Sequence, residues 1–314
     1  MKLICACAAT ALLVTAGVPS PAAQARDPLA LGLIRPDGIL LPVAVLDTGQ
    51  WIDPRPDSGD AIHLDRMIEA LPSYWRERRQ QVPQLWHIAT SPSEPLTAAK
   101  VATHVVYGEH CGHQVGLLTD VRRVGGDTFR RKLAMSRPMP YAMPAAVDPA
   151  DTEWKPLIAR VYEEAALQEA ATIARQEKHA GRSSELEPLP ERSGLRLRRL
   201  FGHRSAGART LYYEAERTYE KPMFPGGRAE PHLLAASGWI HAQDGAAPSV
   251  LHRHALVSTR TFTTPQTITP LAILTIDGAT VWAVIEHGYE NETLTILQVE
   301  PGVRRALIKP IGGC

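Results

Sequence analysis

Short apolar runs separated by polar turn residues extend along most of the chain, and this pattern is typical of antiparallel β-structure. Near the start, residues 31–34 and 39–46 are apolar and flank the sequence Arg-Pro-Asp-Gly at residues 35–38. Pro and Gly stand where a tight turn needs them, so the two runs predict a hairpin. Further strands in this half are expected at residues 86–88, 100–107 and 114–121.

The last third of the chain repeats this pattern. At least six strand-like runs occur there, at residues 211–217, 238–242, 250–258, 271–276, 280–286 and 293–299. Turn signals such as Asp277-Gly278 separate them, and the spacing predicts an antiparallel meander. Residues 41–51 and 270–282 also resemble each other, because each has an apolar run, an Asp and Gly turn and then Trp. This similarity suggests two related sheet layers.

One long helix is expected at residues 151–179, where apolar residues recur at helical spacing. The stripe consists of Trp154, Leu157, Ile158, Val161 and Ala165. Asp151 is expected to be the N-cap, Glu163 and Glu164 to face outward, and Gly181 to follow the last turn. The fold class is therefore mainly β (α+β), with antiparallel sheets or a sandwich-like β-meander and one long helix near residues 151–180.

The domain organisation follows from these elements and from two weaker patterns. Residues 60–78 have helical spacing that Pro72 must interrupt, and residues 182–209 are rich in Ser, Pro, Gly and Arg, which predicts a mobile linker or exposed excursion. The expected parts are a signal peptide (1–25), an N-terminal β-rich part (26–145), a helix with a basic flexible linker (146–210) and a C-terminal meander (211–314). Alternatively, residues 26–314 form a single domain.

The first 25 residues have the organisation of a signal peptide. Lys2 precedes an apolar stretch at residues 3–18, prolines break it, and the triplet Ala-Gln-Ala at residues 23–25 fits a cleavage site before Arg26. The sequence thus predicts a secreted or periplasmic protein, with a retained signal anchor as the alternative. No later stretch is apolar and long enough to cross a membrane, so no transmembrane segment is expected in the mature chain.

Charge narrows the choice of partners. The whole chain has 34 Lys and Arg residues against 33 Asp and Glu residues, and removal of the signal peptide takes away only Lys2. The mature chain is formally neutral, which gives no general attraction to nucleic acid. The local exception is the basic segment with Arg196, Arg198, Arg199 and Arg204, a candidate for binding a partner or an anionic membrane surface. An ordinary exposed excursion is the alternative.

Histidines supply the candidate metal ligands. His104, His110 and His113 surround Cys111, and imidazole and thiolate are ligands that zinc accepts. His252 and His254 are two residues apart in an expected strand, so their side chains are predicted to share one face. Their spacing matches no established metal motif, and an exposed polar loop and an exposed strand face are the alternatives. No cofactor is therefore expected.

Candidate catalytic residues are few. Glu214 and Glu216 alternate along an expected strand and should project from one face, as paired acids do in glycoside hydrolases. The residues around Gly288, which include Glu286 and His287, are a second polar group. Ser205 does not lie in a nucleophile elbow, because the residue two positions before it is His rather than Gly. Phosphate-binding loops and dinucleotide fingerprints are missing.

Taken together, these patterns favour an exported, non-enzymatic binding or scaffold protein of the periplasm or cell envelope. Its partner would be an unknown envelope protein or polymer. The alternative function is a secreted, possibly metal-assisted hydrolase that acts on an envelope polymer. A thiol-redox role for Cys111 has little support, because no Cys-x-x-Cys motif is present.

Cleavage of the signal peptide leaves two cysteines, Cys111 and Cys314, and an oxidising compartment favours a disulfide between them. The closed loop of roughly 200 residues would contribute on the order of 5 kcal/mol to stability. Two free thiols are the alternative. Alkylation of the exported protein, denatured without reductant, should label neither cysteine, whereas labelling of both would contradict the disulfide.

Overall fold

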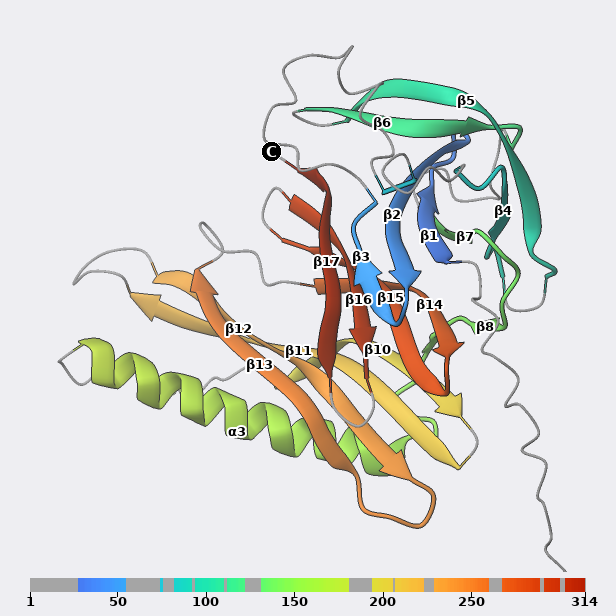
Figure 1. Ribbon diagram of the computed structural model, residues 1–314. Helices are drawn as coiled ribbons and strands as arrows, with labels where there is room; N and C mark the ends of the chain where they lie inside the picture. Colours follow the sequence, from blue (N-terminus) through green and yellow to red (C-terminus); the bar gives the residue numbers. More distant parts are fainter. Residues whose placement is uncertain are drawn as a thin grey trace, which may run out of the picture.

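The computed structural model describes residues 28–54, 74–75, 82–91, 94–109, 112–121, 131–180, 194–205, 207–222, 229–259, 267–288, 291–299 and 303–313. Antiparallel strands dominate this part of the chain, and they form three sheets accompanied by one long helix (Figure 1). The predicted mainly β (α+β) class is therefore confirmed. The expected signal peptide, most of the weak helical pattern at residues 60–78, and Gly181 lie outside the described residues.

Sheet A contains the N-terminal strands. They are β1 (Leu29–Ile34), β2 (Ile39–Asp47), β3 (Gln50–Ile52), β4 (Leu85–Ile88), β5 (Thr97–Glu109), β6 (Gly112–Thr119) and β7 (Lys132–Met135). Their order is β1-β7-β4-β5-β6-β2-β3, and β1 also pairs with β2, so the sheet closes on itself into a ring with β3 attached outside. The predicted β1–β2 hairpin is confirmed.

Sheets B and C contain the other strands. Sheet B has the order β17-β16-β15-β14-β8, with β8 (Tyr141–Ala142), β14 (Thr267–Ile276), β15 (Ala279–His287), β16 (Asn291–Gln298) and β17 (Arg304–Gly313). Sheet C has the order β13-β12-β11-β10-β9, with β9 (Ala145–Ala146), β10 (Arg196–Ser205), β11 (Ala208–Pro222), β12 (Ala229–Gln243) and β13 (Ser249–Thr259). The expected single meander is thus divided between two sheets.

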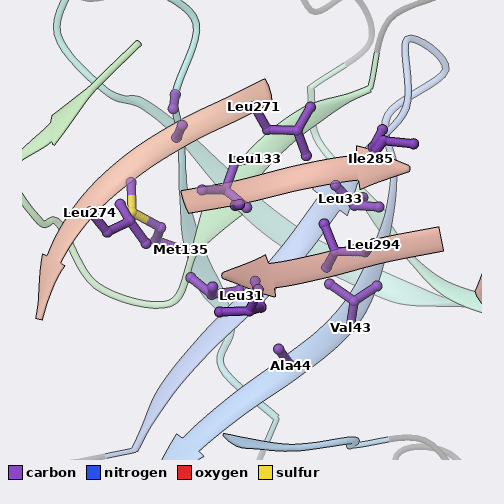
Figure 2. Packing of buried hydrophobic residues seen from close by; sticks show 14 of the residues in the cluster. Leu31, Leu33, Val43, Ala44, Leu133, Met135, Leu271, Leu274, Ile285 and Leu294 are labelled. Carbon is purple, nitrogen blue, oxygen red and sulfur yellow. The ribbon is translucent and has the colours of Figure 1, made fainter. Parts of the chain in front are cut away.

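Sheet B lies between the other two sheets and is buried on both faces. Leu271, Leu274 and other residues on one face pack against Leu31 and Leu133 of sheet A (Figure 2). Residues on the other face, such as Trp282, pack against aromatic residues of sheet C. A strand buried on both faces needs apolar residues at every position, and this explains the uninterrupted apolar run in β15.

The resemblance between residues 41–51 and 270–282 extends to backbone geometry. Each segment has a register shift directly after a proline, next to Pro42 in β2 and next to Pro270 in β14. Each also ends in a turn whose two central residues have positive φ, which is the type I′ geometry of tight hairpins. Both segments contribute to the same cluster between sheets A and B, so this interface joins two similar hairpins.

Helix α3 (Lys155–Ala180) covers the face of sheet C that points away from sheet B (Figure 1). The predicted stripe is buried against this sheet, with Leu157 and Val161 fully inaccessible. The helix begins later than expected, because the Asp151 side chain accepts a hydrogen bond from the Glu153 amide in a turn that precedes it. None of the helices in the described part is long and apolar enough to span a membrane.

Two expectations about polar residues were wrong. Glu164 does not face outward, since it is only 1% exposed and pairs with Arg253 of β13. The basic segment 196–205 is not a linker but strand β10, which pairs with β11 along its length. Glu164 follows Leu157 by seven residues and Val161 by three, so helical periodicity itself places it on the buried face. In β10, a register shift between Leu197 and Arg199 interrupts the alternation of apolar and polar residues that would have marked a strand.

Gly238 of β12 lies very close to β11 and β13, so a larger residue at this position tests the packing of sheet C. A Cβ atom added at Gly238 would lie 2.5 Å from the backbone oxygen of His252 and 2.8 Å from the Tyr213 ring. We predict that Gly238→Ala lowers the free energy of unfolding by about 1–3 kcal/mol, measured by urea denaturation. Gly194→Ala is the control, because that Cβ would meet nothing within 4 Å. Equal effects of the two substitutions would contradict the packing.

Candidate functional site

An open cavity of about 540 Å³ lies where sheets B and C meet at one end. Its walls are the end of β12, the start of β13 and the β14–β15 turn. They comprise His241, Gln243, Ser249, Leu251, Asp277, Gly278, Ala279 and Thr280. The lining thus combines hydroxyl, amide, imidazole and carboxylate groups with apolar surface from residues such as Leu251 and Ala279. A cavity of this size accommodates a small ligand or a short segment of a polymer.

The turn residues position the carboxylate of this cavity. Asp277 and Gly278 have φ angles of 48° and 79°, which a tight hairpin between β14 and β15 requires. The sequence analysis identified this Asp-Gly pair as a turn signal and not as part of a site. On the opposite wall, the Thr210 hydroxyl lies 3.1 Å from Nδ1 of His241, and this contact helps to orient the imidazole.

The candidate acid Glu214 belongs to a different part of the same interface. The Ile268 amide donates a hydrogen bond of 3.0 Å to Glu214, and Arg199 donates one of 3.1 Å to the Ile268 carbonyl. These two side chains of sheet C therefore satisfy both backbone groups of one residue of sheet B. The outer edge of β14 pairs with β8 only at Ile273 and Leu274. At Ile268, Glu214 and Arg199 therefore supply the hydrogen bonds that a neighbouring strand would otherwise provide.

Burial raises the pKa values of both Glu214 and its neighbour Tyr212. Glu214 is 7% exposed, and its pKa is raised mainly by burial, although its hydrogen bond to Ile268 and nearby Arg199 oppose the shift. Tyr212 donates a hydrogen bond of 2.9 Å to Glu214, and burial raises the pKa of its phenol further above the usual value. The carboxyl group acts as an acceptor that joins two sheets.

Glu214 and Glu216 project from the same face of β11, as their alternation predicts. Glu214 contacts sheet B, whereas the opposite face of β11 contacts α3 through Tyr213 and Arg217. Glu216 forms an ion pair of 3.0 Å with Arg198. Each of the two acids thus has a partner within the protein.

The basic residues proposed as a partner surface are largely paired as well. Arg198 binds Glu216, Arg199 binds the Ile268 carbonyl, and Arg204 lies 2.9 Å from Glu153. Arg196 is exposed. Most of the positive charge of β10 is therefore compensated by neighbouring acids and carbonyl groups.

The two expected histidine groups are on different sheets. His104 is an exposed residue of β5 in sheet A, while His252 and His254 are on β13 in sheet C. His110 and both cysteines of the predicted disulfide, Cys111 and Cys314, lie outside the described residues. Among the side chains that the structure describes, no three His, Cys, Asp or Glu residues gather in an arrangement suited to a metal ion.

His252 and His254 are close enough for their charges to interact. The pKa of His252 is lowered first by burial and then by the positive charges of Arg305 and His254, whereas Glu286 acts in the opposite direction. Arg305 itself lies 3.2 Å from Glu286. The prediction that the two imidazoles share a face agrees with this proximity, and the intervening Arg253 reaches α3 instead.

A second polar group joins sheets A and B. The Thr269 hydroxyl lies 2.8 Å from Nε2 of His287, and Nδ1 of His287 lies 3.1 Å from Glu292. Arg131, which precedes β7 of sheet A, binds Glu292 at 2.6 Å. The pKa of Glu292 is lowered to about 2, chiefly by the hydrogen bond from His287. The sequence analysis noted His287 but missed Thr269, whose strand gave only an apolar signal.

Comparisons with known proteins add no functional information. The chain matches no protein-family model, no curated protein and no solved structure. Inferences about function therefore rest on the groups described above.

Two substitutions of Glu214 separate its role as an acceptor from its charge. Glu214→Ala leaves the Ile268 amide and the Tyr212 hydroxyl without this acceptor, so we predict a loss of about 1–3 kcal/mol in unfolding free energy. Glu214→Gln retains an acceptor oxygen, and we expect its stability at pH 7 to stay within about 1 kcal/mol of the wild type.

The effect of pH on this comparison has a definite sign. Because the pKa of Glu214 is raised in the folded state, the folded protein binds the proton more tightly than the unfolded chain does. Ionisation therefore lowers stability as pH rises above the unfolded pKa of about 4.5. Glu214→Gln should gain stability relative to the wild type between pH 4 and pH 7 in urea denaturation. If Glu214→Gln were as unstable as Glu214→Ala at pH 7, the account would be contradicted.

Proposed function

We propose that the protein is an exported binding or scaffold protein of the periplasm or cell envelope, and that it binds its ligand in the cavity between sheets B and C. The observation that carries this proposal is the cavity itself, about 540 Å³ in volume and open to solvent. The N-terminal sequence supports the location, because its apolar stretch and Ala-Gln-Ala triplet are typical of a signal peptide.

The lining indicates what kind of ligand would fit. Its polar groups are one carboxylate, one imidazole, hydroxyl groups and an amide, and it contains neither Lys nor Arg. Such a set offers hydrogen bonds in both directions without positive charge. It suits a neutral or positively charged segment of an envelope protein or polymer better than a phosphate or another anion.

The rigidity of the walls also supports binding. Trp239 of sheet C and Trp282 of sheet B pack edge to face with ring centroids 4.7 Å apart in the same interface. Strands β12 and β15, which carry these rings, continue to the cavity. A site whose walls belong to packed strands requires little ordering when a ligand binds, and this lowers the entropic cost of association.

A hydrolase acting through Glu214 is the alternative suggested by the sequence. General acid catalysis needs a carboxyl group that reaches the substrate. Glu214 is buried and accepts hydrogen bonds from Ile268 and Tyr212. This geometry favours a structural role for that residue, so the binding function is preferred.

Site-specific photocrosslinking in the organism of origin, at native expression level, tests the proposal. A photoreactive phenylalanine analogue replaces Gln243, an exposed residue of the cavity wall. We expect one predominant adduct, identified by mass spectrometry as an envelope protein or polymer. The control places the same analogue at Ala166, an exposed residue of α3, and should give no such adduct.

A second variant ties the adduct to the chemistry of the cavity. Asp277→Asn removes the negative charge but keeps a residue that tolerates the φ of 48°. We expect it to reduce the Gln243 adduct at least about threefold. Similar crosslinking from Gln243 and Ala166, or no adduct at either position, would contradict the proposed function.

A further inference from the structure

Thr269, His287 and Glu292 form a hydroxyl, imidazole and carboxylate chain on three adjacent strands of sheet B. His287 of β15 stands directly opposite Glu292 of β16, and Thr269 of β14 is its diagonal neighbour, because β14 pairs Thr267 with His287. All three side chains point to the face that packs against sheet A. Register therefore brings together groups that are up to 23 residues apart in the sequence.

The hydrogen bonds give each group a definite role. Nδ1 of His287 lies 3.1 Å from the Glu292 carboxylate, and Nε2 lies 2.8 Å from the Thr269 hydroxyl. An ionised carboxylate holds the imidazole proton on Nδ1, so Nε2 is free to accept the proton of the threonine hydroxyl. A nucleophile, a base and a group that orients the base are the components of an activated hydroxyl.

The position of this chain also permits access by a substrate. His287 and Glu292 are 34% and 33% exposed in their side chains, and Thr269 is half-buried. A similar hydroxyl and imidazole contact exists between Thr210 and His241, but Thr210 is only 1% exposed. Thr269 is therefore the more exposed of these two threonines.

We propose that Thr269, His287 and Glu292 form an acyl-transfer site whose substrates are activated esters. The Thr269 oxygen attacks the carbonyl carbon while Nε2 of His287 takes the hydroxyl proton. The bond to the leaving alcohol then breaks, and His287 returns the proton to the leaving oxygen. Water, deprotonated by His287, releases the carboxylic acid and regenerates the threonine hydroxyl. This activity goes beyond the proposed binding function and uses residues outside the cavity.

Arg131 makes the site depend on the packing of sheets A and B. Its guanidinium binds the second oxygen of Glu292 at 2.6 Å and is itself only 11% exposed. This contact fixes the carboxylate in the orientation that His287 needs. Arg131 and Glu292 are positioning residues, because neither contacts the acyl group.

Incubation of the mature protein with p-nitrophenyl acetate tests the proposal. We expect a burst of p-nitrophenol equivalent to one acetyl group per chain, which peptide mapping of the acid-quenched wild type places on Thr269. Slower release of p-nitrophenol should follow as water regenerates the threonine hydroxyl. Thr269→Ser should retain acetylation. Acetylation confined to other residues, or no adduct above that of the unfolded chain, would overturn the proposal, and this readout on the wild type does not depend on the folding of any variant.

Substitutions then separate catalysis from structure. Thr269→Val and His287→Gln should each lower the rate of acetylation at least about tenfold, as expected when a general base is lost. Glu292→Gln should slow the reaction while the adduct stays on Thr269. Thr275→Val, at an exposed position of the same strand, is the matched control and should leave the rate unchanged. An equal rate in Thr269→Val and the wild type would also overturn the proposal.

Discussion

The burial of both faces of sheet B is the constraint on which the rest of the structure depends. Successive residues of β15 point alternately to sheet A and to sheet C, so Ala283 and Ile285 pack on one side and Trp282 and Val284 on the other. Neither face can be exposed to water without a large loss of apolar burial. The closed sheet A and the long sheet C with its helix are the two layers that cover these faces.

Polar groups at the two interfaces follow from this layering. A backbone edge that enters an interface must find hydrogen bonds, and Ile268 finds them in Glu214 and Arg199 of the neighbouring sheet. At the other interface, Arg131 of sheet A binds Glu292 of sheet B. Glu214, which the sequence suggests as a candidate acid, thus joins two sheets by accepting a hydrogen bond from Ile268. Candidate sites remain where an interface opens to solvent, at the cavity and around Thr269.

The sequence predicts local structure here better than it predicts long-range pairing. Period-two alternation located most strands, and helical spacing located α3, because both depend on residues close in the chain. The same alternation correctly placed His252 and His254 on one face. It did not show that Arg253 would lie opposite Glu164, because that contact joins distant segments. Strands β10 and β11 are neighbours in the sequence, but a register shift between Leu197 and Arg199 interrupts the alternation in β10. The division of the meander into two sheets depends on tertiary packing, whereas the contact between Thr269 and His287 depends on the register of the β14–β15 hairpin.

Hydrogen–deuterium exchange of the intact protein tests the central position of sheet B most directly. If this sheet is the buried middle layer, the amides of β15 exchange only through global unfolding and are the slowest in the described part of the chain. Amides on the side of α3 that faces away from sheet C should exchange much faster than those of β15. Exchange of the β15 amides at rates similar to those of α3 would contradict the account, because such a strand would have at least one face open to solvent.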